Sequence, residues 1–155
     1  MIIIEEIPAE RADEFWELQF GYLVGDGMLE TEEERAYFSG DEYRGHVEGL
    51  MLRDPDQLHM VYFVRDGVRI GASMYCIYQS EDGKCLISDF WVFPEYRGNG
   101  TGHACFEALT AYTKADGAAY YALNYSKEDS HRFWLSNGFT DSGKDEYGSN
   151  LMIKR

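Results

Sequence analysis

The sequence has few basic residues for its length. Its 155 residues include 14 Lys and Arg against 28 Asp and Glu, which gives a formal net charge of −14. Proteins that bind DNA or RNA use clustered basic side chains to neutralise phosphates, and no basic stripe runs along this chain. We therefore expect no nucleic-acid partner. The acidic surface favours cationic partners through its electric field, although a need for solubility would account for it equally well.

Long apolar runs are also missing. No stretch approaches the roughly 20 apolar residues that a helix needs to cross a bilayer, so we expect no membrane partner. Residues 1–6 lack a basic flank and are too short for a signal peptide, which favours a cytoplasmic protein.

Cysteine is scarce and irregularly spaced. Cys76, Cys85 and Cys105 show neither a C-x-x-C spacing nor a histidine partner pattern. Zinc sites and redox motifs depend on such spacing, so we expect no metal site, and reduced core thiols instead. Cys76 and Cys85 flank a predicted hairpin, which leaves a disulfide between them as the less favoured alternative.

The composition is that of a protein with a packed core, since 45% of the residues are hydrophobic and 15% are aromatic. The sequence contains no repeat, linker or low-complexity tract, and residues 1–155 are predicted to form a single domain. Apolar periodicity and turn residues predict strands at 2–6, 58–65, 68–79, 84–93, 118–124, 139–146 and 149–154. They predict helices at 9–21, 31–38, 42–53, 101–116 and 129–137, the second opened by a Thr31–Glu34 capping box and the last capped by Asp129.

The most informative stretch follows the strand at 84–93. Pro94 and Arg97 come next, and three glycines then alternate with polar residues in the order Gly98, Asn99, Gly100, Thr101, Gly102. Alternating glycines allow main-chain N–H groups to gather around an anion. The start of a helix adds unpaired N–H groups and the positive end of its dipole. The pattern therefore predicts a pyrophosphate site between a strand and a helix.

Two common phosphate-binding loops do not match this stretch. A P-loop requires Gly-Lys-Ser/Thr, and no lysine follows the glycines. A dinucleotide-binding loop requires G-x-G-x-x-G with an acidic residue about 20 positions later, at the end of a strand. Here the third glycine comes one place early, and the acid at that distance, Asp116, closes a helix instead.

The pattern Arg97-x-x-Gly100-x-Gly102, preceded by Val92-x-Pro94, resembles the acyl-CoA loop of the GNAT N-acetyltransferase superfamily. The order of the predicted elements, β-α-α-β-β-β-α-β-α-β-β, resembles the same superfamily over nearly the whole chain. The resemblance implies an α/β fold of the mixed α+β kind. Its centre would be a mixed, mostly antiparallel sheet of six to seven strands with a splayed parallel pair and about four helices.

The resemblance also implies the coenzyme site, with acetyl-CoA as the cofactor. Main-chain N–H groups from Arg97 to Gly102 would hold the pyrophosphate, and Thr101 and His103 would add side-chain donors. The strand before the loop would splay from its parallel neighbour and pair with the pantetheine arm, and an N–H near Val92 would stabilise an oxyanion. The cofactor-binding residues expected are Phe90, Trp91, Val92, Arg97, Gly98, Asn99, Gly100, Thr101, Gly102, His103, Lys127, Ser130 and Trp134. For the Arg97 side chain, a surface salt bridge is the alternative.

Asp89 is the expected catalytic residue, because it is the one acid within this strand. A carboxylate can take the proton that an ammonium acceptor must lose before it attacks. The run from Asp89 to Gly98 is similar to the diamine acetyltransferase branch, in which a further Glu often stands at the position of Ser88. Asp89 is thus expected to bind a cationic amine, to act as base, or both; a structural carboxylate is the alternative. Seven acids against one Arg between Asp26 and Glu42 indicate either solvated helices or a mouth for a cationic amine.

The stretch from Tyr121 to Phe139 resembles a second family segment, Asn-x-x-Ala-x-x-x-Tyr-x-x-x-Gly-Phe. Lys127, Ser130 and Trp134 stand at its Asn, Ala and Tyr positions. In many relatives that tyrosine protonates the leaving thiolate, whereas an indole N–H is not a usable acid near neutral pH. Three alternatives stay open for a site with Trp134 at this position. The thiolate leaves without a proton donor; another group (Tyr125, Ser130 or His131) replaces the tyrosine as the acid; or the protein binds acyl-CoA with weak or no turnover.

These observations predict an acetyl-CoA-dependent N-acetyltransferase that acts on the primary amine of a small, cationic acceptor by direct attack in a ternary complex. Two alternatives stay open, a non-catalytic or weakly active acyl-CoA-binding module and an acetyltransferase for protein lysines or N-termini. The expected partner is a small-molecule amine, and a homodimer is left open.

Overall fold

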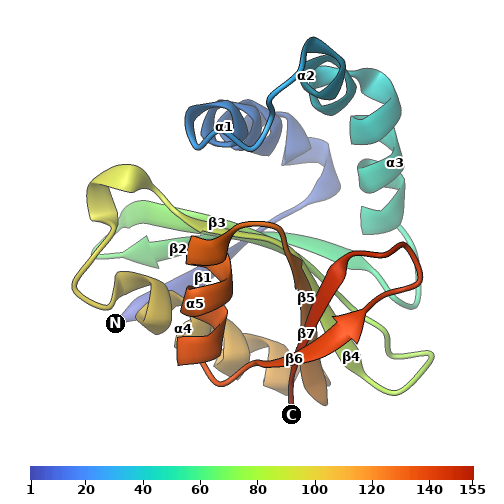
Figure 1. Ribbon diagram of the computed structural model, residues 1–155. Helices are drawn as coiled ribbons and strands as arrows, with labels where there is room; N and C mark the ends of the chain where they lie inside the picture. The colour runs from blue at the N-terminus through green and yellow to red at the C-terminus, as the bar shows by residue number, and fades with distance from the viewer.

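A seven-stranded sheet carries the fold in the computed structural model, which describes residues 1–155 (Figure 1). Its strands, in spatial order, are β1 (Ile2–Ile7), β2 (Leu58–Arg65), β3 (Val68–Ile77), β4 (Lys84–Val92), β5 (Tyr120–Tyr125), β7 (Asn150–Lys154) and β6 (Thr140–Lys144). All neighbours are antiparallel except β4 and β5, which are parallel. The mixed, mostly antiparallel sheet expected from the sequence is thereby confirmed.

Five α-helices cover the two faces of the sheet, where about four were expected. They are α1 (Ala12–Gly25), α2 (Glu32–Ser39), α3 (Asp41–Met51), α4 (Thr101–Ala115) and α5 (Glu128–Ser136). Figure 1 shows α1, α2 and α3 above the sheet and α4 on its opposite side. None of the helices has the length and apolar character that crossing a membrane would require.

The end of α1 differs from the expectation that Gly21 would break it. The helix continues to Gly25, and a Cβ built on Gly21 would meet no atom within 4 Å. An exposed glycine inside a helix costs only about 1 kcal/mol. The burial of Phe15, Trp16 and Leu23 on the inner side of α1 outweighs that cost, since each large apolar side chain contributes about 1.5–3 kcal/mol.

The helix starts were predicted with mixed success. The Thr31–Glu34 capping box is present at the start of α2. The N-cap of α5, however, is Lys127 and not Asp129, which lies within the first turn and bonds to Arg132. An acidic residue in the first turn complements the helix dipole without capping it.

The side chains of β4 alternate between two cores, because successive residues of a strand face opposite sides. Trp91 belongs to a cluster with α1 and α3, and Val92 belongs to a cluster with α4 and α5. Cys85 and Cys105 lie in the second cluster, and all three cysteines are buried and free, as the sequence indicates. The strand before the glycine loop therefore directs side chains toward the helices on both faces of the sheet.

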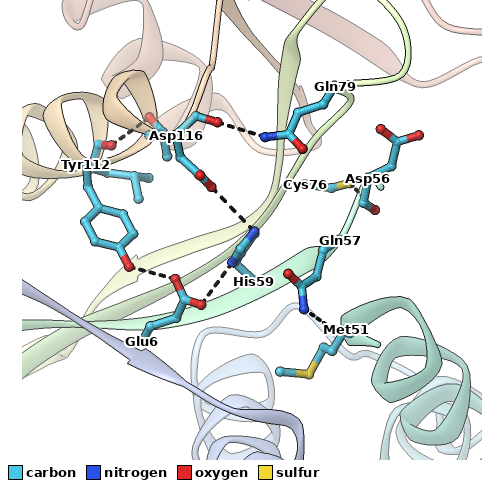
Figure 2. A network of polar contacts seen from close by, with 11 residues as sticks. Glu6, Met51, Asp56, Gln57, His59, Cys76, Gln79, Tyr112 and Asp116 are labelled. Carbon is cyan, nitrogen blue, oxygen red and sulfur yellow. Dashed lines mark hydrogen bonds and ion pairs between the residues drawn. The ribbon is translucent and has the colours of Figure 1, made fainter. Parts of the chain in front are cut away.

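A polar network fixes the far end of α4 to the edge of the sheet (Figure 2). His59 Nδ1 of β2 lies 3.1 Å from Glu6 Oε2 of β1, and the Tyr112 hydroxyl of α4 donates to Glu6 Oε1 at 2.7 Å. The His59 ring stacks on Tyr75 with the ring centroids 5.0 Å apart. Just beyond α4, Asp116 accepts from the Gln79 amide through its main-chain oxygen at 2.9 Å. Two strands and a turn thus hold the carboxyl end of α4, while its amino end is left to the glycine loop.

Candidate functional site

The parallel pair β4–β5 splits halfway along its length. The two strands are paired only from Lys84 to Ile87, opposite 120–123. On the other side of β4, Met74 pairs with Asp89 and Tyr75 pairs with Ile87, so Ser88 is an extra, bulged residue. A bulge bends its strand and increases the local twist. From Ser88 onward β4 therefore stays with β3 and diverges from β5, which is the splay that the resemblance implied.

A cavity of about 590 Å³ fills the gap between the diverging strands. It reaches both sides of the sheet, since α1 and the turn after it contribute lining residues, as do β4, the glycine loop, β5 and α5. The expected site residues that line it are Asp89, Phe90, Trp91, Val92, Arg97, Gly98, Gly102, Lys127, Ser130 and Trp134. Asn99, Gly100, Thr101 and His103 lie beyond its lining, along the loop and the start of α4.

The main chain of β4 faces this gap at Val92. The N–H of Phe93 donates to Ile70 O of the β3 side at 2.9 Å. Neighbouring residues of an antiparallel pair direct their main-chain groups to opposite sides, so the N–H and C=O of Val92 point away from β3. The Val92 carbonyl accepts from Arg97 Nε at 2.8 Å, which leaves the Val92 N–H as a donor in the gap.

The glycine loop exposes a set of main-chain donors. Gly98, Asn99 and Gly100 have φ values of 95°, 55° and 76°, and their N–H groups have no main-chain acceptor within the chain. The helix α4 begins at Thr101, so the next N–H groups, of Gly102 and His103, lie in its first turn and have no helical partner. The first turn contains no acidic residue. Unpaired donors at the positive end of a helix make a site for an anion.

Two N–H groups that were expected in this set are already in use. The N–H of Arg97 donates to Pro94 O at 3.3 Å, and the N–H of Thr101 donates to Gly98 O at 3.1 Å. The side-chain hydroxyl of Thr101 is buried and also donates to Gly98 O, at 2.9 Å. These bonds close the turn on itself and hold the remaining donors in place.

The His103 side chain connects α4 to the end of α5. Its Nδ1 lies 2.6 Å from Asn137 Oδ1, and its Nε2 lies 3.1 Å from Glu107 Oε1. Both ring nitrogens of His103 thus bond within the two helices beside the loop. The main-chain N–H of His103 is the group of this residue that is left free for an anion.

The Arg97 side chain points from the loop toward the end of α1. Its Nη2 lies 2.8 Å from Asp26 Oδ2, so the alternative of a salt bridge holds for the guanidinium. Burial would raise the pKa of Asp26, but hydrogen bonds from Arg97 and Tyr22 outweigh it and lower that pKa. Lys127 Nζ donates to Asp26 O at 3.0 Å. The end of α1 is thereby tied to both the loop and the start of α5.

Asp89 lies on the α1 side of the sheet and lines the cavity. Its Oδ2 accepts from Gln19 Nε2 of α1 at 2.7 Å. Burial raises the pKa of Asp89 to about 6, while the hydrogen bond from Gln19 acts in the opposite direction. The carboxyl group therefore changes its charge within the range in which enzymes commonly work.

Sequence reasoning missed two residues on this side. Gln19 is 1% exposed, and the Tyr22 ring stacks on Trp91 with centroids 4.9 Å apart and lines the cavity. The signal for Gln19 was its place among the apolar residues of the α1 stripe, where a buried amide calls for a polar partner. Nothing local distinguishes Tyr22.

Trp134 lies on the opposite side of the cavity, within an aromatic cluster. It is buried and packs edge-on against Phe90 and Phe106, with centroid separations of 5.0 Å and 5.3 Å. Of the three groups considered as substitutes for the missing tyrosine, Tyr125 and Ser130 line the cavity. His131 turns away and pairs with Asp141, 2.8 Å from Nε2 to Oδ1.

The acids between Asp26 and Glu42 do not form a lining of the cavity. Only Asp26 reaches it, and that carboxylate is paired with Arg97. Residues 32–34 are exposed in the first turn of α2, where negative side chains complement the helix dipole. The geometry supports solvated helices for this segment.

The loop fits a pyrophosphate group. A Cβ built on Gly98 or Gly100 would enter open space, so the absence of side chains there leaves room beside the free N–H groups. The cavity continues from Gly98 and Gly102 into the gap between β4 and β5, which suits a coenzyme with an extended arm.

Comparison with known proteins agrees with this geometry. The model of the acetyltransferase (GNAT) family matches residues 11–139. No curated protein matches the sequence significantly. Among solved structures, the chain is similar to the PaiA N-acetyltransferase of Thermoplasma acidophilum in complex with coenzyme A, with 17% identity, a TM-score of 0.73 and coverage of 100% and 99% of the two chains.

Two further solved structures share the fold. An acetyltransferase from Thermus thermophilus is 12% identical, with a TM-score of 0.73 and coverage of 99% of this chain and 96% of that one. An aminoglycoside acetyltransferase from an uncultured soil metagenomic sample, in complex with sisomicin, is 16% identical, with a TM-score of 0.63 and coverage of 88% and 86%.

Proposed function

Since the chain belongs to the acetyltransferase (GNAT) family, we propose that it transfers the acetyl group of acetyl-CoA to the primary amine of a small, cationic acceptor in one ternary complex. The observation that carries this proposal is the cavity that passes between β4 and β5, with Asp89 on its α1 side and the glycine loop at its other end. A donor and an acceptor bound from opposite sides of the sheet would meet at β4.

Acetyl-CoA supplies a thioester whose carbonyl carbon is open to attack by an amine. The main-chain N–H groups of Gly98, Asn99, Gly100, Gly102 and His103 are the donors that we assign to the pyrophosphate. The N–H of Val92 is the donor that we assign to the thioester carbonyl oxygen, because it faces the gap and is not hydrogen-bonded to β3.

Asp89 accepts the proton of the acceptor ammonium. Above pH 6, given its pKa of about 6, the carboxylate is ionised and attracts a cation into the cavity. A base whose pKa lies near the working pH takes a proton and returns it to solvent readily. The contacts of Asp26 with Arg97 and Lys127 tie the end of α1 to the rim of the cavity, beside the proposed acceptor side.

Of the two hydroxyl side chains at the cavity, Tyr125 and Ser130, only the Tyr125 phenol is acidic enough to supply a proton to the leaving thiolate. A thiolate whose thiol has a pKa of about 8.5 is also stable enough to leave without a proton donor. Trp134 contributes packing on this side.

The proposal is tested with purified protein, acetyl-CoA and a panel of polyamines, aminoglycosides and amino acids, with thiol release as the readout. We expect turnover with at least one cationic amine, and a loss of about 100-fold or more in kcat for Asp89→Asn. Asp82→Asn, at an exposed acid in the turn between β3 and β4, is the matched control and should retain full activity.

A non-catalytic acyl-CoA-binding module is the second candidate, and Trp134 is the observation that favours it. A blank amine panel together with tight CoA binding would support this candidate. The variant Trp134→Tyr then distinguishes the two, since a gain of turnover would indicate that the missing phenol limits activity. A loss of turnover in an active protein would indicate that the indole has its own role in the site.

A further inference from the structure

The Gln19 side chain bridges three elements behind Asp89. Its Nε2 donates to Asp89 Oδ2 of β4 at 2.7 Å and to the Tyr43 hydroxyl of α3 at 3.3 Å. The residue is 1% exposed, and its Oε1 is buried with no hydrogen-bond partner. The amide is therefore held on the side of the carboxylate that lies away from solvent.

A buried amide with an unused oxygen is costly at this position. A buried polar atom without a partner destabilises a fold by about 1–3 kcal/mol. The neighbouring inward positions of α1, Phe15 and Trp16, are apolar, and an apolar side chain at position 19 would avoid the penalty. Stability alone gives no reason for glutamine here, whereas the contact with Asp89 does.

The Gln19 amide favours the ionised state of Asp89 over the protonated one. The ionised carboxylate is an acceptor and takes the Nε2 donor, as the structure shows. The protonated carboxyl group gains an O–H donor and loses acceptor capacity, so the Nε2 contact is weaker in that state. The contact therefore stabilises the carboxylate more than the carboxylic acid, and it acts against the effect of burial.

We propose that Gln19 is a positioning residue that holds the Asp89 carboxylate toward the cavity and stabilises its ionised form through the Nε2 contact, with Tyr43 fixing the amide from α3. This inference rests on the proposed role of Asp89 as the proton acceptor. Gln19 itself does not line the cavity and acts through Asp89.

Few other charged groups face Asp89. The charge of Asp89 acts on Tyr22 of α1 and Tyr43 of α3. It adds to the rise in the pKa of both phenols, after burial and, for Tyr22, after Asp26. On β3, Ser73 donates to the main-chain oxygen of Asp89 at 2.6 Å. Both phenols are neutral near pH 6, and no lysine or arginine bonds the carboxylate, so the amide is its one direct partner.

The variant Gln19→Met tests the proposal, because methionine has the length of glutamine and lacks the amide donor. The first readout is the carboxyl carbon resonance of Asp89, assigned with Asp89→Asn and titrated in the coenzyme-free protein. We expect the titration midpoint to rise by about one pH unit, since a hydrogen bond to the ionised form is lost. Gln79→Met, at an exposed amide that bonds Asp116 O, is the matched control with no expected change.

The second readout is the pH dependence of kcat/KM with an acceptor from the amine panel. The acidic limb should move upward by the same amount, so that activity falls about fivefold at the wild-type midpoint and recovers in alkaline solution, with KM for acetyl-CoA unchanged. If Gln19→Met does not fold, Gln19→Asn replaces it, because its shorter amide withdraws the donor but keeps a polar group.

The outcomes separate this inference from the proposed function. A midpoint that stays at its wild-type value in a folded variant overturns the inference, whether or not the protein is active. A raised midpoint with a blank amine panel supports the contact and counts against the acetyl transfer. If Gln19→Met is active but the acidic limb of its kcat/KM profile does not shift with the Asp89 carboxyl resonance, the role of Gln19 in the reaction is overturned.

Discussion

Gly102 lies directly against the ring of Phe133. A Cβ built on Gly102 would be 2.8 Å from Phe133 Cε1 and 3.1 Å from Cζ. Because Gly102 is in the first turn of α4 and Phe133 is in α5, this contact sets how closely the end of the glycine loop approaches the helix that carries Trp134. Gly102 is thus required for packing, whereas Gly98 and Gly100 are required for their backbone conformation.

Gly102→Ala should weaken coenzyme binding more than it weakens the fold. Overpacking costs about 1–3 kcal/mol, and alanine returns about 1 kcal/mol of helix propensity. The displaced first turn moves the free N–H groups, and we expect CoA affinity by calorimetry to fall about tenfold, or about 1.4 kcal/mol. Gly45→Ala in α3, where a Cβ meets nothing within 4 Å, should keep full affinity. Wild-type affinity in Gly102→Ala would show that the turn tolerates the shift.

Gly100→Ala and Gly67→Ala form a pair that isolates the role of the loop. The two glycines have φ values of 76° and 77°, and neither Cβ would meet an atom within 4 Å. Both variants pay a similar strain of about 1–2 kcal/mol, so their melting temperatures should fall alike. Only Gly100→Ala places a methyl group beside the free N–H groups, and it alone should lose about tenfold or more in CoA affinity. Equal affinities in the two variants would contradict an anion site at this loop.

Asp89→Asn should stabilise the protein in neutral solution. Burial raises the pKa of Asp89 from 3.8 to about 6, so the folded state binds its proton more tightly than the unfolded state does. The shifted pKa of Asp89 contributes to the free energy of unfolding below about pH 3.8. This contribution, up to about 3 kcal/mol, is lost as the pH rises through about 6. Urea unfolding should show the variant to be more stable above pH 6 and equal to the wild type near pH 4. A constant difference across this range would mean that the carboxylate is not desolvated.

Glu6→Gln should change the response of the fold to acid without affecting the coenzyme site (Figure 2). The hydrogen bond with His59 lowers the pKa of Glu6 below 4.5, against desolvation, and Tyr112 adds to the effect. A lowered acid contributes stability above its unfolded pKa and loses it as the pH falls through the folded value. The variant should therefore lose less than about 1 kcal/mol at neutral pH, since Glu6 is partly exposed.

The same Glu6→Gln variant should show a flatter decline of stability below about pH 4.5, measured by thermal unfolding. CoA affinity should stay unchanged, because the network holds the carboxyl end of α4 and the glycine loop lies at its amino end, about 20 Å away along the helix axis. A loss of affinity would show that the two ends of α4 are coupled.

The sequence by itself determined the elements whose signals are local. The strand Leu58–Arg65 has the bounds that apolar periodicity and turn residues predicted. The glycine loop was recognisable because closely spaced glycines such as Gly98 and Gly100 are typical of a main chain with positive φ, which residue type alone indicates. The end of α1 was predicted wrongly at Gly21, since the burial of distant partners outweighs local propensity.

Tertiary structure alone decided which distant residues meet in the site. Gln19 and Asp89 are 70 positions apart, and Asp26 and Arg97 are 71 apart. No periodicity records such pairs, because helix and strand patterns describe only which side of an element faces a core. The bulge at Ser88 likewise depends on the register between β3 and β4. The charge of Asp89 follows from these long-range contacts, since burial and the Gln19 amide set its pKa, and neither is visible along the chain.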